Sequence, residues 1–199
     1  MHLPLSPQEY LHTPSAASDM ADLRCANDDL GAVPATSEVV FRHFRDALSR
    51  FPTGVTVITA LTPDGTAIGV TISSFNSVSL EPPLILWSLS STSPNLAAFA
   101  QVSHYAVNIL AADQRWISEC FAAREEDRFT GVRVRQGLGG VPLVEGCSAW
   151  FECSHEAQYP GGDHLILVGR VHRFTLGEVS EPLIFHGGRY RELGAEADR

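Results

Sequence analysis

The pattern of apolar and polar positions changes at about residue 37. Residues 1–36 are rich in Pro, Ser, Ala and Asp and show no sustained period, so we expect an N-terminal extension that is partly disordered or packed on a partner subunit. From Ser37 onward, apolar residues recur at helical spacing as far as Phe51, and Pro52 and Gly54 predict the end of this helix. Residues 37–199 contain no internal repeat or linker and predict one domain.

Short β-branched and apolar segments follow, separated by turn residues. They predict strands at 55–60, 66–72, 84–89, 105–110, 148–156, 164–174 and 182–186. Ser93 and Pro94 predict the cap and first turn of a short helix, and a second helix carries Trp116, Ile117 and Phe121 on one stripe. Many short strands with few helices favour a mainly β fold with flanking helices, arranged as a closed or partly closed antiparallel barrel.

Charge and composition narrow the choice of partners. The formal net charge is −9, and all 14 basic residues are arginine, which argues against nucleic acid or anionic membranes as the main partner but leaves room for a local arginine pocket. No apolar run approaches the roughly 20 residues of a membrane span, and the first residues lack a signal-peptide pattern, so we expect a cytoplasmic protein. The four cysteines lack CxxC spacing and predict packing residues, with no metal.

Two hydroxyl-rich segments are the first candidates for chemistry. Thr71, Ser73, Ser74, Asn76 and Ser77 follow a predicted strand and offer the short donors and acceptors that suit the polar edge of a ring system, although such residues are equally ordinary in turns. The second segment carries Ser88, Ser91 and Ser93 ahead of the short helix, where free N–H groups favour a phosphate. Helix capping by Ser93 is the alternative, and Pro94 removes one donor.

Three further features have a structural and a functional interpretation. Arg128 and Phe129 follow a charge run, which is usually a solvated helix end. Gly161, Gly162 and Asp163 lead into a strand that begins at His164, where a side chain can face a cleft, although a lone histidine is more often structural. Near the C-terminus, a Gly-Gly turn precedes Tyr190, a possible site wall.

The sequence resembles the flavin reductase-like domain family over about residues 38 to 193. The resemblance rests on Pro-Thr-Gly-Val at 52–55 and on Thr-x-Ser-Ser-Phe-x-Ser-Val-Ser-Leu-x-Pro-Pro-Leu at 71–84. It also rests on Gly-Asp-His at 162–164 with Gly169 beyond. That family includes the reductase components of two-component aromatic monooxygenases.

The resemblance implies a split β-barrel of Greek-key antiparallel topology that binds FMN or FAD and forms a homodimer. It implies an NAD(P)H:flavin oxidoreductase in which hydride passes from the nicotinamide of NADH or NADPH to the flavin, and reduced flavin leaves for a separate oxygenase. His164 is expected beside the nicotinamide. The expected flavin-binding residues are Thr53, Thr71, Ser73, Ser74, Asn76, Ser77, Ser88, Ser91, Ser93, Arg128, Phe129 and Tyr190. A flavin-binding module without turnover and a related flavin oxidase remain the alternatives.

Overall fold

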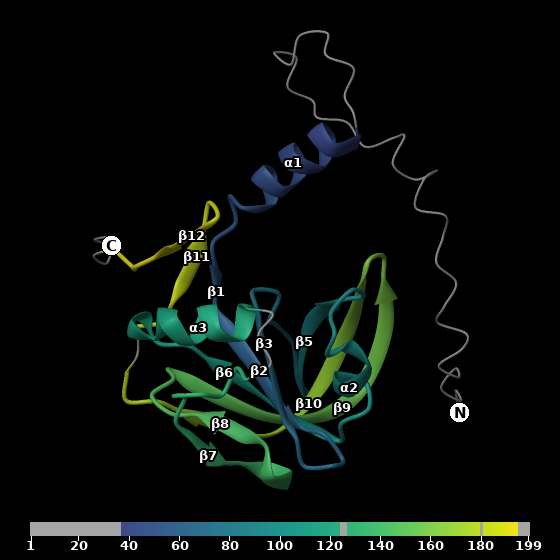
Figure 1. The fold of residues 1–199 in the computed structure, drawn as a ribbon, viewed down its shortest axis with the longest axis vertical. Helices are drawn as coiled ribbons and strands as arrows, with labels where there is room; N and C mark the ends of the chain where they lie inside the picture. Colours follow the sequence, from purple (N-terminus) through teal and green to yellow (C-terminus); the bar gives the residue numbers. More distant parts are fainter. Residues whose placement is uncertain (1–36, 124–126, 180, 195–199) are drawn as a thin grey trace, which may run out of the picture.

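The computed structural model describes residues 37–123, 127–179 and 181–194, so the predicted extension at 1–36 lies outside it. The fold is dominated by a main sheet of seven antiparallel strands in the order β3-β2-β6-β9-β10-β5-β4 (Figure 1). These strands are β2 (Thr56–Leu61), β3 (Ala67–Ile72), β4 (Asn76–Leu80), β5 (Pro83–Ser90), β6 (His104–Ile109), β9 (Ala149–Gly161) and β10 (His164–Leu176).

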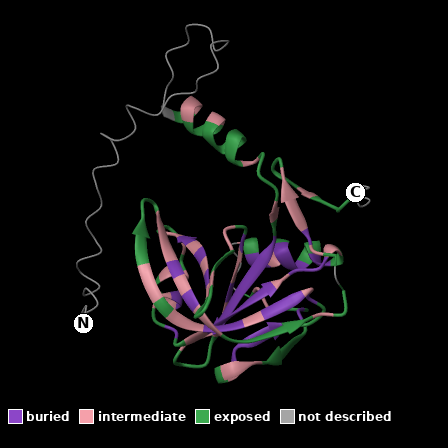
Figure 2. Cartoon of the chain, turned by 180° about the vertical axis from the view of Figure 1, so that it is seen from behind, coloured by how far each residue is buried: buried purple, intermediate pink, exposed green. Residues whose placement is uncertain are grey.

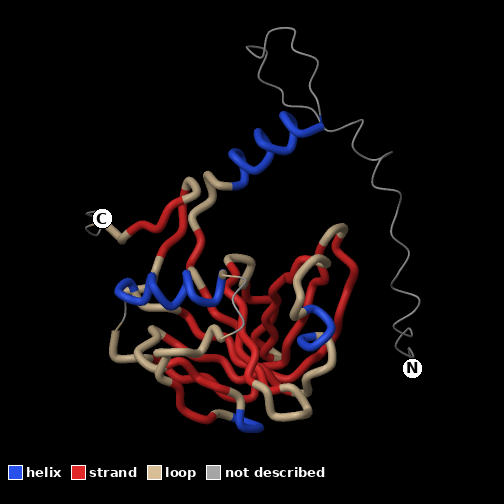
Figure 3. Tube along the Cα trace, viewed as in Figure 1, coloured by secondary structure: helices blue, strands red, loops and turns tan. Residues whose placement is uncertain are grey.

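Two small sheets and a few helices complete the described chain. One small sheet contains β1 (Thr53–Gly54), β11 (Ile184–His186) and β12 (Arg189–Arg191), and the other contains β7 (Val134–Gln136) and β8 (Pro142–Val144). The helices are α1 (Ser37–Leu48), α2 (Leu96–Phe99), α3 (Arg115–Ala122), and the 3₁₀ turns η3 (Ala112–Gln114) and η4 (Leu138–Gly140). Figure 3 shows these helical segments in blue, separate from the strands in red. No helix in the described part of the chain is long and apolar enough to cross a bilayer.

The mainly β, antiparallel fold predicted from the sequence is confirmed. The two edge strands of the main sheet, β3 and β4, follow each other in the chain and are joined by residues 73–75. Within the described residues the two strands do not pair with each other, so hydrogen bonds do not close the sheet into a barrel. The connecting segment therefore spans the open side of the sheet.

Several predicted boundaries were wrong. Helix α1 ends at Leu48, so Phe51 lies beyond it. Helix α2 begins at Leu96 with Asn95 at its N-cap, so Ser93 and Pro94 are loop residues that precede the helix. The stretch that was expected to be a hydroxyl-rich loop contains strand β4, because exposed Ser and Asn side chains are acceptable on a sheet edge.

Buried residues are concentrated in the central strands (Figure 2). Strand β2 is buried at every position except its last, because other elements cover both of its faces. Asn108 has no exposed surface and pairs two buried backbone groups. Its amide donates to the Val57 carbonyl at 2.8 Å, and its oxygen accepts from the Val144 N–H at 2.8 Å. Asn108 therefore helps to fasten β8 onto the main sheet, together with Thr59 and Trp150, which donate to β8 carbonyls.

Gly169 in β10 has no side chain because the Tyr105 hydroxyl occupies that space. A Cβ at position 169 would lie 1.9 Å from the Tyr105 oxygen and 3.2 Å from a methyl group of Ile85. Burial raises the pKa of Tyr105, so the hydroxyl stays protonated in the core. The absence of a Cβ at 169 therefore lets β10 pack closely over a buried polar group.

We predict that Gly169→Ala destabilises the fold by about 1–3 kcal/mol, the usual cost of overpacking a core. Chemical denaturation would measure the change in unfolding free energy. Gly54→Ala is the matched control, since a Cβ at Gly54 has no atom within 4 Å. Equal stability of the two variants would contradict the steric argument.

Candidate functional site

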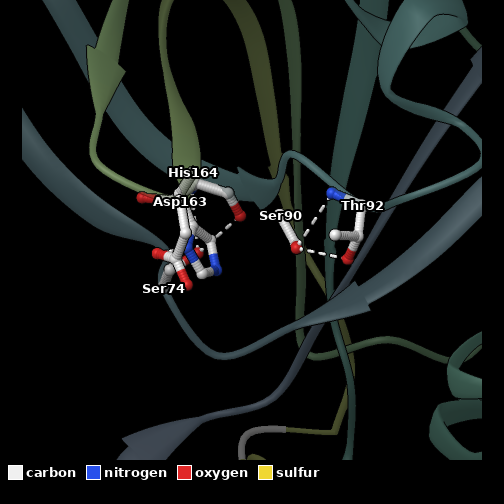
Figure 4. A network of polar contacts seen from close by, with 6 residues as sticks. Ser74, Ser90, Thr92, Asp163 and His164 are labelled. Carbon is white, nitrogen blue, oxygen red and sulfur yellow. Dashed lines mark hydrogen bonds and ion pairs between the residues drawn. The ribbon is translucent and has the colours of Figure 1, made fainter. Parts of the chain in front are cut away.

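A cavity of about 340 Å³ opens where the ends of β3 and β5 meet the start of β10. Its volume lies at the lower end of the range for ligand pockets. Figure 4 shows Asp163 paired with His164, and Ser90 at the end of β5 with Thr92 on the turn that follows. The lining residues are Val70, Thr71, Ile72, Ser73, Ser74, Ser88, Leu89, Ser90, Ser93 and His164.

Ser74 fixes the segment between β3 and β4 onto β5. Its hydroxyl accepts a hydrogen bond from the Ser88 N–H at 2.9 Å and donates to the Ser88 carbonyl at 3.2 Å. The ladder between β4 and β5 begins at Asn76 and Leu86, so the Ser74 side chain takes the place of a paired strand residue beyond it. One cavity wall is therefore held by a side chain that imitates backbone pairing.

The lining suits a flat, largely apolar ring with a polar rim. Val70, Ile72 and Leu89 contribute apolar surface, and hydroxyls from both strands supply donors and acceptors. Ser73 is exposed and its hydroxyl makes no hydrogen bond to a described residue. A flavin has this combination of an apolar ring and polar edge atoms, so the residues present fit it.

His164 stands at the rim, at the first position of β10. Its Nδ1 lies 2.7 Å from a carboxylate oxygen of Asp163, and the side chain is 44% exposed (Figure 4). The hydrogen bond from His164 lowers the pKa of Asp163, which therefore stays ionised. The Ser91 N–H donates to the Asp163 carbonyl at 2.9 Å, which ties this turn to the end of β5. The imidazole is thus held in place while one face remains open.

Thr71 and Tyr190 both attach to Ser118 of α3. The Thr71 hydroxyl donates to the Ser118 carbonyl at 2.7 Å, and the Tyr190 hydroxyl lies 2.9 Å from the Ser118 hydroxyl. The Arg115 guanidinium sits 5.0 Å from the centre of the Tyr190 ring. Tyr190 therefore contacts α3, and only Thr71 of this pair lines the cavity.

Arg128 reaches the base of the same strand. Its guanidinium donates to the Gly69 carbonyl at 2.8 Å, and the Asn95 amide donates to that carbonyl at 3.3 Å. The neighbouring Phe129 ring packs edge-on against the Phe121 ring, with the two ring centres 4.9 Å apart. Both predicted residues thus pack beside the cavity wall, outside the cavity lining.

The remaining predicted site residues are not part of the cavity lining. Thr53 is in β1 and pairs with Phe185, while Asn76 and Ser77 are exposed at the start of β4. Ser91 contributes its backbone N–H to the turn already described. The sequence predictions missed Ser90 and the apolar lining residues Val70, Ile72 and Leu89, which we call the apolar floor. Strand alternation along β5 would have indicated Ser90, because it lies two positions beyond Ser88.

Nothing in the described ranges suggests a metal centre. No group of three or more His, Cys, Asp or Glu side chains in residues 37–123, 127–179 and 181–194 is arranged to hold an ion. Cys147 and Cys153 are buried, and burial raises the pKa of each thiol to about 12, so both stay protonated packing groups.

Comparison with known proteins assigns the fold and the cavity to one family. The model of the flavin reductase-like domain matches residues 48–194, a span that contains every residue of the cavity lining. The chain therefore belongs to the flavin reductase-like family.

Several relatives carry more specific names. An FMN reductase (NADH), SmoA, from Agrobacterium fabrum (strain C58) is 44% identical over 149 residues, which are 75% of this chain and 84% of the relative. The reductase component of a flavin-dependent trigonelline monooxygenase from Acinetobacter baylyi is 46% identical over 67% of this chain, but the match spans only 43% of that relative.

A solved structure gives the same indication. The Streptomyces globisporus NADH:FAD oxidoreductase SgcE6, in complex with NAD and FAD fragments, superposes with a TM-score of 0.75 at 35% identity. The superposition covers 79% of this chain and 95% of that one.

We predict that Ser74→Ala destabilises the protein by about 1–2 kcal/mol, because the half-buried Ser88 N–H loses its partner. Amide hydrogen exchange at Ser88 should accelerate as the wall loosens. Ser73→Ala is the control, because its exposed hydroxyl has no described partner. Unchanged exchange at Ser88 in Ser74→Ala would contradict this role.

Proposed function

We propose that the protein is an NAD(P)H:flavin oxidoreductase that reduces FMN or FAD and passes the reduced flavin to a separate oxygenase. The observation that supports this most strongly is the hydroxyl-lined cavity with His164 at its rim, inside the family-matched segment. Relatives named as an FMN reductase (NADH) and as a monooxygenase reductase subunit support the same activity. A cytoplasmic location is inferred from the use of NAD(P)H.

The cavity residues divide the work of binding. Thr71, Ser73, Ser74, Ser88 and Ser93 face the flavin with hydroxyls or backbone groups, and the apolar floor contacts its ring. Arg128 and Phe129 stiffen the wall at β3, Tyr190 holds α3, and Thr53, Asn76, Ser77 and Ser91 lie outside the cavity lining. The flavin, when bound, supplies the hydride-accepting chemistry. The protein positions the nicotinamide against it, with His164 at the open face.

NADH and NADPH oxidation with added FMN or FAD tests this proposal. A reductase gives nucleotide oxidation that depends on flavin and continues over many turnovers. A flavin-binding module binds flavin but leaves the nucleotide unoxidised, and a flavin oxidase turns over only with its own substrate. Either of those outcomes would overturn the proposed reaction.

The role of His164 has its own expected outcome. His164→Ala should lower kcat/KM for NADH about tenfold, the equivalent of losing one hydrogen bond, while flavin affinity stays nearly unchanged. Stopped-flow reduction of pre-bound flavin measures this effect. His172→Ala is the control, because His172 is exposed on the same strand. Normal reduction kinetics in His164→Ala, with a lower melting temperature, would assign His164 a structural role only.

We also propose that the protein is a homodimer. Helix α1 stands apart from the main sheet (Figures 1 and 2). Its Phe41, Phe44 and Leu48 lie on one stripe and are 40%, 46% and 58% exposed. A stripe of this kind on a helix is normally covered. A second copy of the chain, with its own uncovered stripe, provides a matching surface.

Phe44→Asp should therefore shift the protein from dimer to monomer, because a charge on the stripe opposes apolar contact. Light scattering coupled to size-exclusion chromatography measures the mass. Arg42→Asp places the same residue off the stripe and should leave the dimer intact. A monomeric wild-type protein, or a dimeric Phe44→Asp variant, would contradict this assembly.

A further inference from the structure

Helix α2 is too short to hold its own position. It contains four residues, and no side chain caps its N-terminus. A single helical turn is not stable alone, so contacts with the rest of the fold must fix where it lies. The loop immediately before α2 contains Ser93, which lines the cavity. Whatever holds α2 therefore influences the site.

Two side chains of β9 form hydrogen bonds with the C-terminal end of α2. The His155 Nε2 lies 2.8 Å from the Phe99 carbonyl, and the Gln158 amide donates to the Ala100 carbonyl at 3.0 Å. We call His155 and Gln158 the α2 clamp. Carbonyls at the end of a helix lack partners within the helix, so these two bonds satisfy groups that need them.

The surroundings of His155 define its protonation. A carbonyl can only accept, so Nε2 must carry the proton that it donates to Phe99. Burial lowers the pKa of His155, which keeps the ring neutral. Nδ1 is buried and has no hydrogen-bond partner among the described residues. The Tyr105 ring packs beside the imidazole, with the two ring centres 5.2 Å apart. The imidazole is therefore a fixed, neutral donor.

Continuous hydrogen bonds connect the clamp to Ser93. The Ala100 N–H donates to the Leu96 carbonyl at 2.9 Å, and the Leu96 N–H donates to the Ser93 carbonyl at 3.1 Å. The Asn95 N–H also donates to the Ser93 hydroxyl at 3.3 Å. A displacement at Phe99 or Ala100 thus moves the backbone that carries Ser93.

We propose that His155 is a positioning residue for flavin binding, acting through α2 on Ser93. Gln158 assists it at the neighbouring carbonyl. Neither residue lines the cavity. This inference rests on the proposed function, because it takes the cavity to be the flavin site.

A titration of FMN against the purified protein, followed by flavin fluorescence, tests the proposal without any turnover. His155→Leu should weaken FMN binding about fivefold, as expected for losing one hydrogen bond. His155→Gln places an amide donor near the position of Nε2 and should restore affinity to within about twofold of wild type. His172→Leu is the control on the exposed side of the neighbouring strand. Gln158→Leu gives an independent loss if His155→Leu does not fold.

A double-mutant cycle with Ser93→Ala separates positioning from general destabilisation. If the clamp acts through Ser93, His155→Leu adds little to the affinity loss of Ser93→Ala, because the two share one effect. Additive losses, an unchanged affinity in both clamp variants, or failure of His155→Gln to rescue would overturn the inference. Thermal unfolding of each variant, measured in parallel, reports whether it is folded.

The two proposals fail in different ways. If the wild-type protein does not bind FMN or FAD, the proposed function fails. If it binds flavin and Ser93→Ala weakens that binding while the clamp variants do not, only the clamp inference fails.

Discussion

The site depends on the hydrogen bonds between the Ser74 hydroxyl and the Ser88 backbone. The main sheet is open between β3 and β4, and the short segment that joins them must cross that opening. Without this anchor, residues 73–75 would have no bond to a neighbouring strand, because the β4–β5 ladder begins only at Asn76. Ser74 pairs this segment with β5, so hydroxyls from two distant strands face one cavity. The opening in the sheet becomes a binding site because one side chain supplies the missing strand contact.

Around the cavity, other side chains also form hydrogen bonds to backbone groups. Thr71 bonds to the carbonyl of Ser118, and Arg128 bonds to that of Gly69. The α2 clamp applies the same chemistry to Phe99 and Ala100. Arg128 and the α2 clamp bind carbonyls that regular secondary structure leaves unpaired, and Thr71 adds a second hydrogen bond to a carbonyl inside α3. Rigidity around the proposed flavin site therefore comes from side chains that complete the backbone hydrogen bonding.

Hydrophobic periodicity predicted the long strands and α3, because their burial is strong and regular. It missed β4, whose exposed Asn76 and Ser77 resemble turn residues, and it placed the start of α2 too early because Ser93 and Pro94 imitate a helix start. The family resemblance predicted six site residues that the structure places around one cavity: Thr71, Ser73, Ser74, Ser88, Ser93 and His164. Arg128 and Tyr190 were not predictable in detail, since their partners, Gly69 and Ser118, are distant in sequence.

The small sheet of β1, β11 and β12 joins opposite ends of the described chain. The Val55 N–H donates to the Leu183 carbonyl, and the Leu183 N–H donates to the Leu110 carbonyl. During synthesis on a ribosome, residue 183 emerges after all seven strands of the main sheet. The pairing of β1 with β11 and the contact of Tyr190 with α3 must therefore wait for residues 183–191. A nascent chain cut before β11 would leave β1 without its partner.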